Sequence, residues 1–111
     1  MIEPYNTNEP LRAEIDSSRG SLLLEFGSNS CGICQYTQPL LATALQGAKP
    51  IRHIKIEDAA GRPLGRSYKV KLWPTLIFVL NGQEVTRVVR PENIDVIRQA
   101  VGLLLNATAD C

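Results

Sequence analysis

The chain has 111 residues, a length that fits one domain, and 44% of them are hydrophobic, which excludes an intrinsically disordered chain. Its 12 basic and 11 acidic residues nearly balance, so we expect no electrostatic attraction to nucleic acid or to an anionic membrane. The first residues lack the charged start and apolar run of a secretory signal, and no apolar stretch approaches the ~20 residues needed to cross a bilayer. We therefore expect a soluble, cytoplasmic protein with one domain over residues 1–111 and a flexible tail over 106–111.

The first half of the chain predicts a helix, a strand and a second helix. Apolar residues four apart indicate a helix over residues 8–18, which the Arg19-Gly20 pair ends. The mostly apolar run SLLLEF at residues 21–26 is typical of a strand that is buried on both faces. After a short loop, residues 31–46 form a predicted helix, and Pro39 inside it is expected to kink the helix.

The second half predicts three strands, a short helix and a closing helix. Alternating apolar residues indicate a strand over 51–57, and residues 63–69 can form a short helix. Asn81-Gly82 favours a tight hairpin between strands, which are predicted over 75–80 and 85–89. The closing helix, over 91–105, has apolar residues spaced for one face. Alternating strands and helices predict parallel pairing and the hairpin adds an antiparallel pair, which together give a three-layer α/β domain with a mixed sheet.

Two of the three cysteines, Cys31 and Cys34, lie in a Cys-Gly-Ile-Cys sequence at the expected start of a helix. A helix N-terminus carries unsatisfied N–H groups and about +0.5 of an elementary charge, and both favour an ionised sulfur. The thiolate is the nucleophile in disulfide exchange, and this spacing lets the two sulfurs close a disulfide within one turn. We therefore expect Cys31 to attack a disulfide and Cys34 to resolve the mixed disulfide, while Gly32 lets a substrate backbone approach.

Two other interpretations of the cysteine pair stay open at this point. The pair could supply half of a zinc site, but zinc takes four ligands and only His53 and Cys111 remain to complete the set. The pair could also be two inert buried thiols, although its position at an exposed helix start argues against this. We expect no metal and no cofactor, and we expect Cys111 to be dispensable.

The order of these motifs resembles that of the thioredoxin family. Glu25-Phe26 stands where thioredoxins have an acidic residue and a phenylalanine, and Pro39 stands where they have a proline that kinks the helix. Trp73-Pro74-Thr75 is similar to the family's Pro-Thr segment, and Asn81-Gly82 is similar to its hairpin. The resemblance covers nearly the whole chain. It implies a thioredoxin fold, with a central mixed sheet of four to five strands flanked by helices on both faces, and reversible disulfide exchange.

The resemblance also implies roles for residues around the dithiol. Pro74 would be the family's cis proline, which leaves the backbone of the preceding residue free to pair with a substrate strand. Glu25 would help to take the proton from the resolving thiol, and a carboxylate buried in an apolar strand normally has a raised pKa. His53 falls near the place where thioredoxins often have a lysine. It could pair with Glu25 or lie solvated on the surface, and the sequence leaves both interpretations open.

Four features depart from the family's pattern. Ile33 replaces the usual proline between the cysteines and returns one N–H near the sulfur. Ser30 and Gly27 stand where thioredoxins carry tryptophans. Trp73 stands where the family has a small or aliphatic residue, and we expect it to restore apolar contact surface. Arg90 stands where the family has a glycine in a turn. We expect its cation to narrow the space through which a partner approaches the dithiol, or to select acidic partners.

These features predict a thiol–disulfide oxidoreductase that acts mainly as a reductase of protein disulfides, as a monomer. A thioredoxin-reductase-type protein is the candidate electron donor. The alternative is a redox-switched binding or chaperone-like module with specialised partners. Catalysis is assigned to Cys31, Cys34 and Glu25. The residues expected to contact a substrate are Gly32, Ile33, Trp73, Pro74, Thr75 and Arg90.

Overall fold

A four-stranded mixed sheet forms the centre of the computed structural model, which describes residues 4–47, 51–59 and 62–109. Its strands are β1 (Ser21–Gly27), β2 (Arg52–Glu57), β3 (Thr75–Leu80) and β4 (Gln83–Val89), arranged in the order β2-β1-β3-β4. β1 and β2 run parallel, whereas β3 is antiparallel to both β1 and β4. The expected mixed sheet is therefore confirmed, with four strands.

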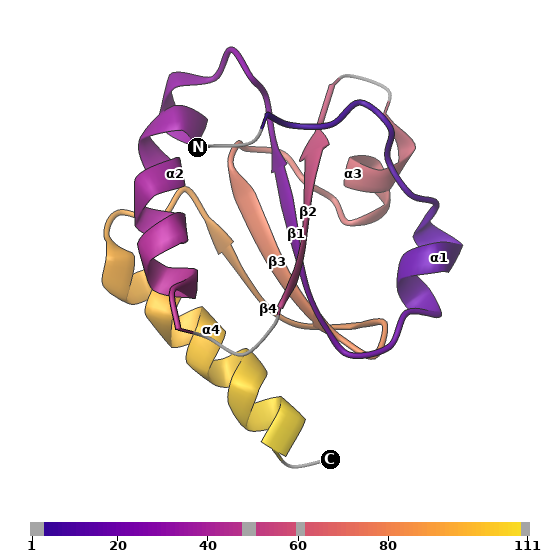
Figure 1. Ribbon diagram of the computed structural model, residues 1–111. Coiled ribbons are helices and arrows are strands. Elements are labelled where there is room, and N and C mark those ends of the chain that lie inside the picture. The colour runs from indigo at the N-terminus through magenta and orange to yellow at the C-terminus, as the bar shows by residue number, and fades with distance from the viewer. Residues whose placement is uncertain (1–3, 48–50, 60–61, 110–111) are drawn as a thin grey trace.

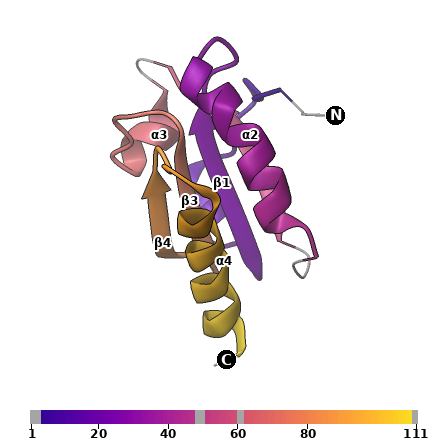
Figure 2. The same ribbon diagram turned by 90° about the vertical axis from the view of Figure 1, so that its left-hand side faces the viewer.

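Helices cover both faces of this sheet. α2 (Gly32–Leu45) and α4 (Ile94–Ala109) lie on one face, while α1 (Arg12–Asp16) and α3 (Pro63–Ser67) lie on the other (Figure 1). Figure 2 looks onto the face that carries α2 and α4. The three-layer arrangement predicted from the sequence is confirmed. Among the described residues, no helix is long and apolar enough to span a membrane.

The two central strands, β1 and β3, contribute side chains to a hydrophobic core on each face. Leu23 and Phe78 belong to the core beneath α2 and α4, whereas Leu24 and Ile77 belong to the core beneath α1 and α3. Burying side chains of this size contributes about 1.5–3 kcal/mol each. Because side chains alternate along a strand, Glu25 shares the face of Leu23, and its carboxylate lies beneath α2.

The hairpin between β3 and β4 turns as its sequence predicts. Asn81 and Gly82 both have positive φ angles, 50° and 83°. The Asn81 side chain accepts a hydrogen bond from the Gly20 N–H at 2.9 Å, which ties the turn to the start of β1. A Cβ on Gly82 would lie 2.0 Å from the carbonyl oxygen of Asp16, so the turn also packs closely against the end of α1.

Helix α1 is shorter than the helix expected over residues 8–18. It begins after Leu11, whose N–H donates to the Glu14 carboxylate at 2.9 Å. It ends at Asp16, where the side chains of Ser17 and Ser18 bond back to carbonyls of the last turn. Serine side chains compete with helical hydrogen bonds in this way, which closes the helix early.

Helix α4 is shifted toward the C-terminus relative to the expected range 91–105. The side chain of Asn93 accepts a hydrogen bond from the Val96 N–H at 3.2 Å and so caps the helix start. The helix continues to Ala109, and the Thr108 hydroxyl donates to the Leu104 carbonyl at 3.0 Å. Residues 106–109, expected in a flexible tail, are therefore helical, and Cys111 lies outside the described residues.

Replacing Gly82 with alanine is expected to lower the free energy of unfolding by about 2 kcal/mol or more, because the positive φ and the Asp16 carbonyl both oppose a Cβ. Gly102→Ala in α4 is the matched control, since a Cβ there meets no atom within 4 Å. That variant should gain roughly 0.5–1 kcal/mol. Urea denaturation measures both changes. A Gly82→Ala protein as stable as the wild type would show that the turn does not need its close contact with α1.

Candidate active site

The two cysteines of the motif lie where β1 gives way to α2. Cys31 caps the helix: its sulfur accepts a hydrogen bond from the Cys34 N–H at 3.2 Å, and its own N–H donates to the Ser28 carbonyl at 3.1 Å. Both thiols are free; Cys31 is partly exposed, whereas Cys34 is fully buried. A substrate disulfide can therefore reach Cys31, whereas the buried Cys34 is shielded from substrate and solvent.

Burial also determines the protonation of Cys34. Burial raises the pKa of the Cys34 thiol to about 11, and the neighbouring Cys31 sulfur adds to this increase. At neutral pH, Cys34 therefore holds its proton, and it can act as a nucleophile only if another group accepts that proton.

The carboxylate of Glu25, behind the dithiol, is completely buried and hydrogen-bonded on both oxygens. His53 Nε2 lies 2.8 Å from Oε1, and the side chain of His53 remains 27% exposed. On the other oxygen, Gln38 Nε2 donates at 2.6 Å and the hydroxyl of Tyr5 also donates. The pair between Glu25 and His53, which the sequence left open, is present.

The pKa of Glu25 differs in direction from the sequence-based expectation. Burial acts to raise this pKa, but the hydrogen bonds from His53, Tyr5 and Gln38 together outweigh burial and hold it below its ordinary value. The raised pKa expected for a buried carboxylate is therefore wrong here, because the sequence did not reveal how many donors surround it. Glu25 is ionised at neutral pH and can accept a proton.

Tyr5 and Gln38 are the main site residues that the sequence analysis missed. A Cβ built on Gly27 would lie 2.6 Å from Tyr5 Cζ, 2.7 Å from the Tyr5 hydroxyl oxygen and 2.8 Å from Cys34 Sγ. The ring of Tyr5 thus fills the space next to Gly27. The one signal in the sequence was the glycine itself, which leaves room beside the dithiol that another side chain must fill.

The loop before β3 lies at the same end of the sheet as the dithiol, because Thr75 pairs with Phe26 in the register of β1 and β3. The Trp73–Pro74 peptide bond is cis, as the resemblance implied. The Trp73 carbonyl is not free, however: Arg90 Nε donates to it at 2.8 Å, and the Arg90 N–H donates to the Pro74 carbonyl at 3.0 Å. The expectation of a free backbone before the proline is thus wrong for this carbonyl.

Arg90 itself has a positive φ of 48°, a conformation that glycine adopts without strain. This agrees with the glycine that the thioredoxin family has at the corresponding position. Arg90 adopts this strained backbone conformation, and its side chain turns back to bond the Trp73 carbonyl.

Two other residues expected to contact a substrate are engaged inside the protein. The indole N–H of Trp73 donates to Asp58 at 2.8 Å, so that the half-buried ring is anchored beside the loop after β2. Thr75 is buried, and its hydroxyl donates to the Leu72 carbonyl at 2.6 Å. Its side chain therefore holds the loop in shape.

The surface around Cys31 is open and partly apolar. Gly32 is exposed, and no atom lies within 4 Å of the place where its Cβ would be. Ile33, two residues after Cys31, is 42% exposed; Leu72, which directly precedes the Trp73–Pro74 loop and which the sequence analysis did not single out, is 48% exposed. In the described part of the chain, no three histidine, cysteine or acidic side chains are grouped as metal ligands.

Comparisons with known proteins agree with this geometry. The model of the thioredoxin family matches residues 4–102. The structure of thioredoxin 2 from Pseudomonas aeruginosa PAO1, in its reduced form, is similar over 96% of this chain and 99% of its own, with a TM-score of 0.85 and 45% identity. A thioredoxin H-type from Picea mariana is 26% identical over 88% of this chain and 78% of its own. Thioredoxin H-type 1 from Nicotiana tabacum is 24% identical over 74% of this chain, a match that spans 64% of that relative.

Limiting iodoacetamide at pH 7 should alkylate Cys31 at least roughly tenfold faster than Cys34, because only Cys31 is exposed and Cys34 keeps its proton. Digestion and mass spectrometry of the labelled peptides measure the ratio. Preferential labelling of Cys34 would reverse the order of the two thiols.

Proposed function

Because the chain belongs to the thioredoxin family, we propose that it is a thiol–disulfide oxidoreductase that reduces protein disulfides. One observation carries this proposal: a partly exposed Cys31 caps α2, a buried Cys34 follows one turn later, and an ionised Glu25 lies behind them. We further propose that the protein works in the cytoplasm as a monomer and passes electrons from a thioredoxin-reductase-type donor to its substrates.

The reaction has two exchange steps. In the first, the Cys31 thiolate attacks one sulfur of the substrate disulfide; a Cys31–substrate bond forms, the substrate S–S bond breaks, and one substrate thiolate leaves and takes up a proton. In the second, Cys34 loses its proton and attacks the Cys31 sulfur, which forms the Cys31–Cys34 disulfide and releases the second substrate thiol. Two electrons pass to the substrate, and the donor returns the protein to its dithiol form.

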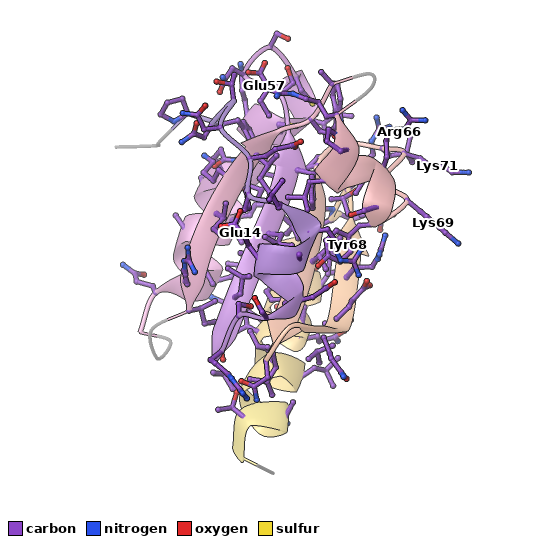
Figure 3. All side chains as sticks on the ribbon, turned by 90° about the vertical axis from the view of Figure 1, so that its right-hand side faces the viewer. Glu14, Glu57, Arg66, Tyr68, Lys69 and Lys71 are labelled. Carbon is purple, nitrogen blue, oxygen red and sulfur yellow. The ribbon has the colours of Figure 1, made fainter. Side chains whose placement is uncertain are left out.

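Exposed apolar and cationic side chains support a partner with apolar and acidic features. Ile33, Leu72 and Val89 expose apolar side chains. Arg66, Lys69 and Lys71 extend into solvent from α3 and the segment that follows it (Figure 3). Cationic side chains steer acidic partners toward a site, and this attraction is screened over ~10 Å at 0.1 M salt.

Arg90 restricts substrate access to the loop. Its bond to the Trp73 carbonyl occupies an acceptor that an extended substrate backbone could use. We propose that a substrate must either displace this guanidinium or bind without that carbonyl. The protein is then more selective than a relative with glycine at this place.

Catalysis of insulin reduction by dithiothreitol tests the proposed function. The wild-type protein should accelerate the reaction, and Cys31→Ser should abolish the acceleration. Cys34→Ser should lose turnover but accumulate a mixed disulfide on Cys31, which intact-mass spectrometry detects. A Cys111→Ser protein serves as the control and should remain active. Full activity of Cys34→Ser would contradict the two-thiol mechanism and would favour a binding or chaperone-like role.

Arg90→Gly should reduce generic disulfides several-fold faster than the wild type, at both low and high salt, because it frees the Trp73 carbonyl and removes a bulky side chain. Arg90→Ala frees the same carbonyl but keeps the strained backbone, so the two variants should be equally fast while only Arg90→Gly becomes more stable, by about 1 kcal/mol. Arg98→Ala, on the exposed surface of α4, controls for loss of charge. Unchanged rates in both Arg90 variants would show that Arg90 does not restrict access.

A further inference from the structure

Hydrogen bonds to two neighbouring segments hold Tyr5 in place. Its N–H donates to the side chain of Asn29 at 2.8 Å. The next residue, Asn6, pairs with β2: its N–H donates to the Lys55 carbonyl at 3.0 Å, and its carbonyl accepts from the Glu57 N–H at 2.9 Å. The N-terminal segment therefore crosses the ends of β1 and β2 beside the dithiol (Figure 1). Backbone hydrogen bonds at Tyr5 and Asn6 therefore hold this segment in addition to the contacts of the Tyr5 side chain.

The Tyr5 hydroxyl connects the two groups between which a proton must move. It donates a hydrogen bond to Glu25 Oε2 and accepts one from Gln38 Nε2 at 3.1 Å. The Tyr5 oxygen and the Cys34 sulfur border the same space, at 2.7 Å and 2.8 Å from the place where a Cβ on Gly27 would lie, and hydrogen bonding by Tyr5 acts to lower the pKa of the Cys34 thiol. The hydroxyl thus has its hydrogen directed at the carboxylate and a lone pair available to the thiol.

We propose that Tyr5 is a catalytic residue that relays the proton of Cys34 to Glu25 during the resolving step; this inference rests on the proposed function and specifies how its second step proceeds. The Cys34 thiol proton passes to the Tyr5 oxygen while the Tyr5 proton passes to the Glu25 carboxylate. The Cys34 sulfur then forms its bond to Cys31 as the Cys31–substrate bond breaks. The substrate leaves as a thiolate, which takes a proton from solvent or from Glu25.

The chemistry of each group fits this sequence. Burial, the charge of Glu25 and its hydrogen bond raise the pKa of Tyr5 well above its usual range, so the tyrosine passes a proton without becoming an anion itself. The Cys31 sulfur contributes to the high pKa of Cys34, and this contribution ends once Cys31 is held in the mixed disulfide. After the relay, the hydroxyl hydrogen faces the Cys34 sulfur and stabilises its negative charge.

The charged groups that face the relay come from β2, and α2 adds a neutral amide between them. His53 and Lys55 approach from β2: His53 pairs with Glu25, and Lys55 Nζ lies 4.8 Å from the centre of the Tyr5 ring. Gln38 of α2 accepts from Lys55 Nζ at 2.7 Å and donates to Glu25, so it fixes the cation and the carboxylate relative to one another. These contacts keep Glu25 ionised before the relay and favour proton return afterwards.

Tyr5→Phe removes the hydroxyl and keeps the ring, so it distinguishes a loss of proton transfer from a loss of packing. The probe is a symmetric aromatic disulfide whose two halves leave as coloured thiolates, the first on attack by Cys31 and the second on attack by Cys34. In a Cys111→Ser background, stopped-flow absorbance resolves both releases. We expect the first rate in Tyr5→Phe to be unchanged and the second to fall about tenfold or more. The second rate should also rise with pH about tenfold per unit in the variant, because hydroxide must replace the internal base.

Three further variants make the outcome decisive. Tyr68→Phe is the matched control: Tyr68 is equally buried, lies between α1 and α3 (Figure 3), and its hydroxyl has no hydrogen-bond partner among the described residues, so both rates should be unchanged. Glu25→Gln should slow the second release as Tyr5→Phe does, and the double variant should be no slower than either single variant.

A second release that stays fast in Tyr5→Phe, or equal slowing of both releases, would overturn the relay. Failure of the proposed function has a different signature, because the wild-type protein would then show no second release at all.

Discussion

An ionised carboxylate in the middle of a sheet must be hydrogen-bonded, because an unpaired buried charge costs several kcal/mol. Glu25 meets this requirement with partners from three separate parts of the chain: His53 from β2, Gln38 from α2 and Tyr5 from the N-terminal segment. Each of these parts must stay in position for the charge to remain satisfied. Through Gln38, this buried group helps the apolar core to fix α2 over β1, and with it the dithiol at the helix start.

The same network links the stability of the protein to its chemistry. Because the folded-state pKa of Glu25 lies below its unfolded value, ionised Glu25 stabilises the fold above its unfolded pKa of ~4.3, and this contribution is lost as the pH falls through the folded value. A carboxylate kept ionised for stability is also a ready proton acceptor next to Cys34, whose thiol is protonated at neutral pH. One arrangement of donors thus serves both purposes.

The sequence predicted those features that depend on local pattern. The limits of β3 are as expected, because Pro74 and the Asn81-Gly82 turn bound a run that is apolar after Thr75, and the dithiol lies at a helix start as its motif requires. The sequence did not predict contacts between distant segments. Tyr5 lies in a segment with no apolar period to mark it, and the bond between Arg90 and the Trp73 carbonyl joins residues that only the β3–β4 pairing brings together.

The close approach between Tyr5 and Gly27 couples two positions that are far apart in the chain. A side chain at position 27 would place its Cβ 2.6 Å from the tyrosine ring, well inside the ~3.5 Å at which carbon atoms normally touch. Neither position can therefore be substituted independently of the other. A larger residue at position 27 needs a smaller one at position 5, and loss of the tyrosine ring leaves a cavity next to the sulfur of Cys34. Fusions or truncations that pull on the N-terminal segment consequently act on the redox centre directly, so the beginning of the chain is a poor place for an affinity tag.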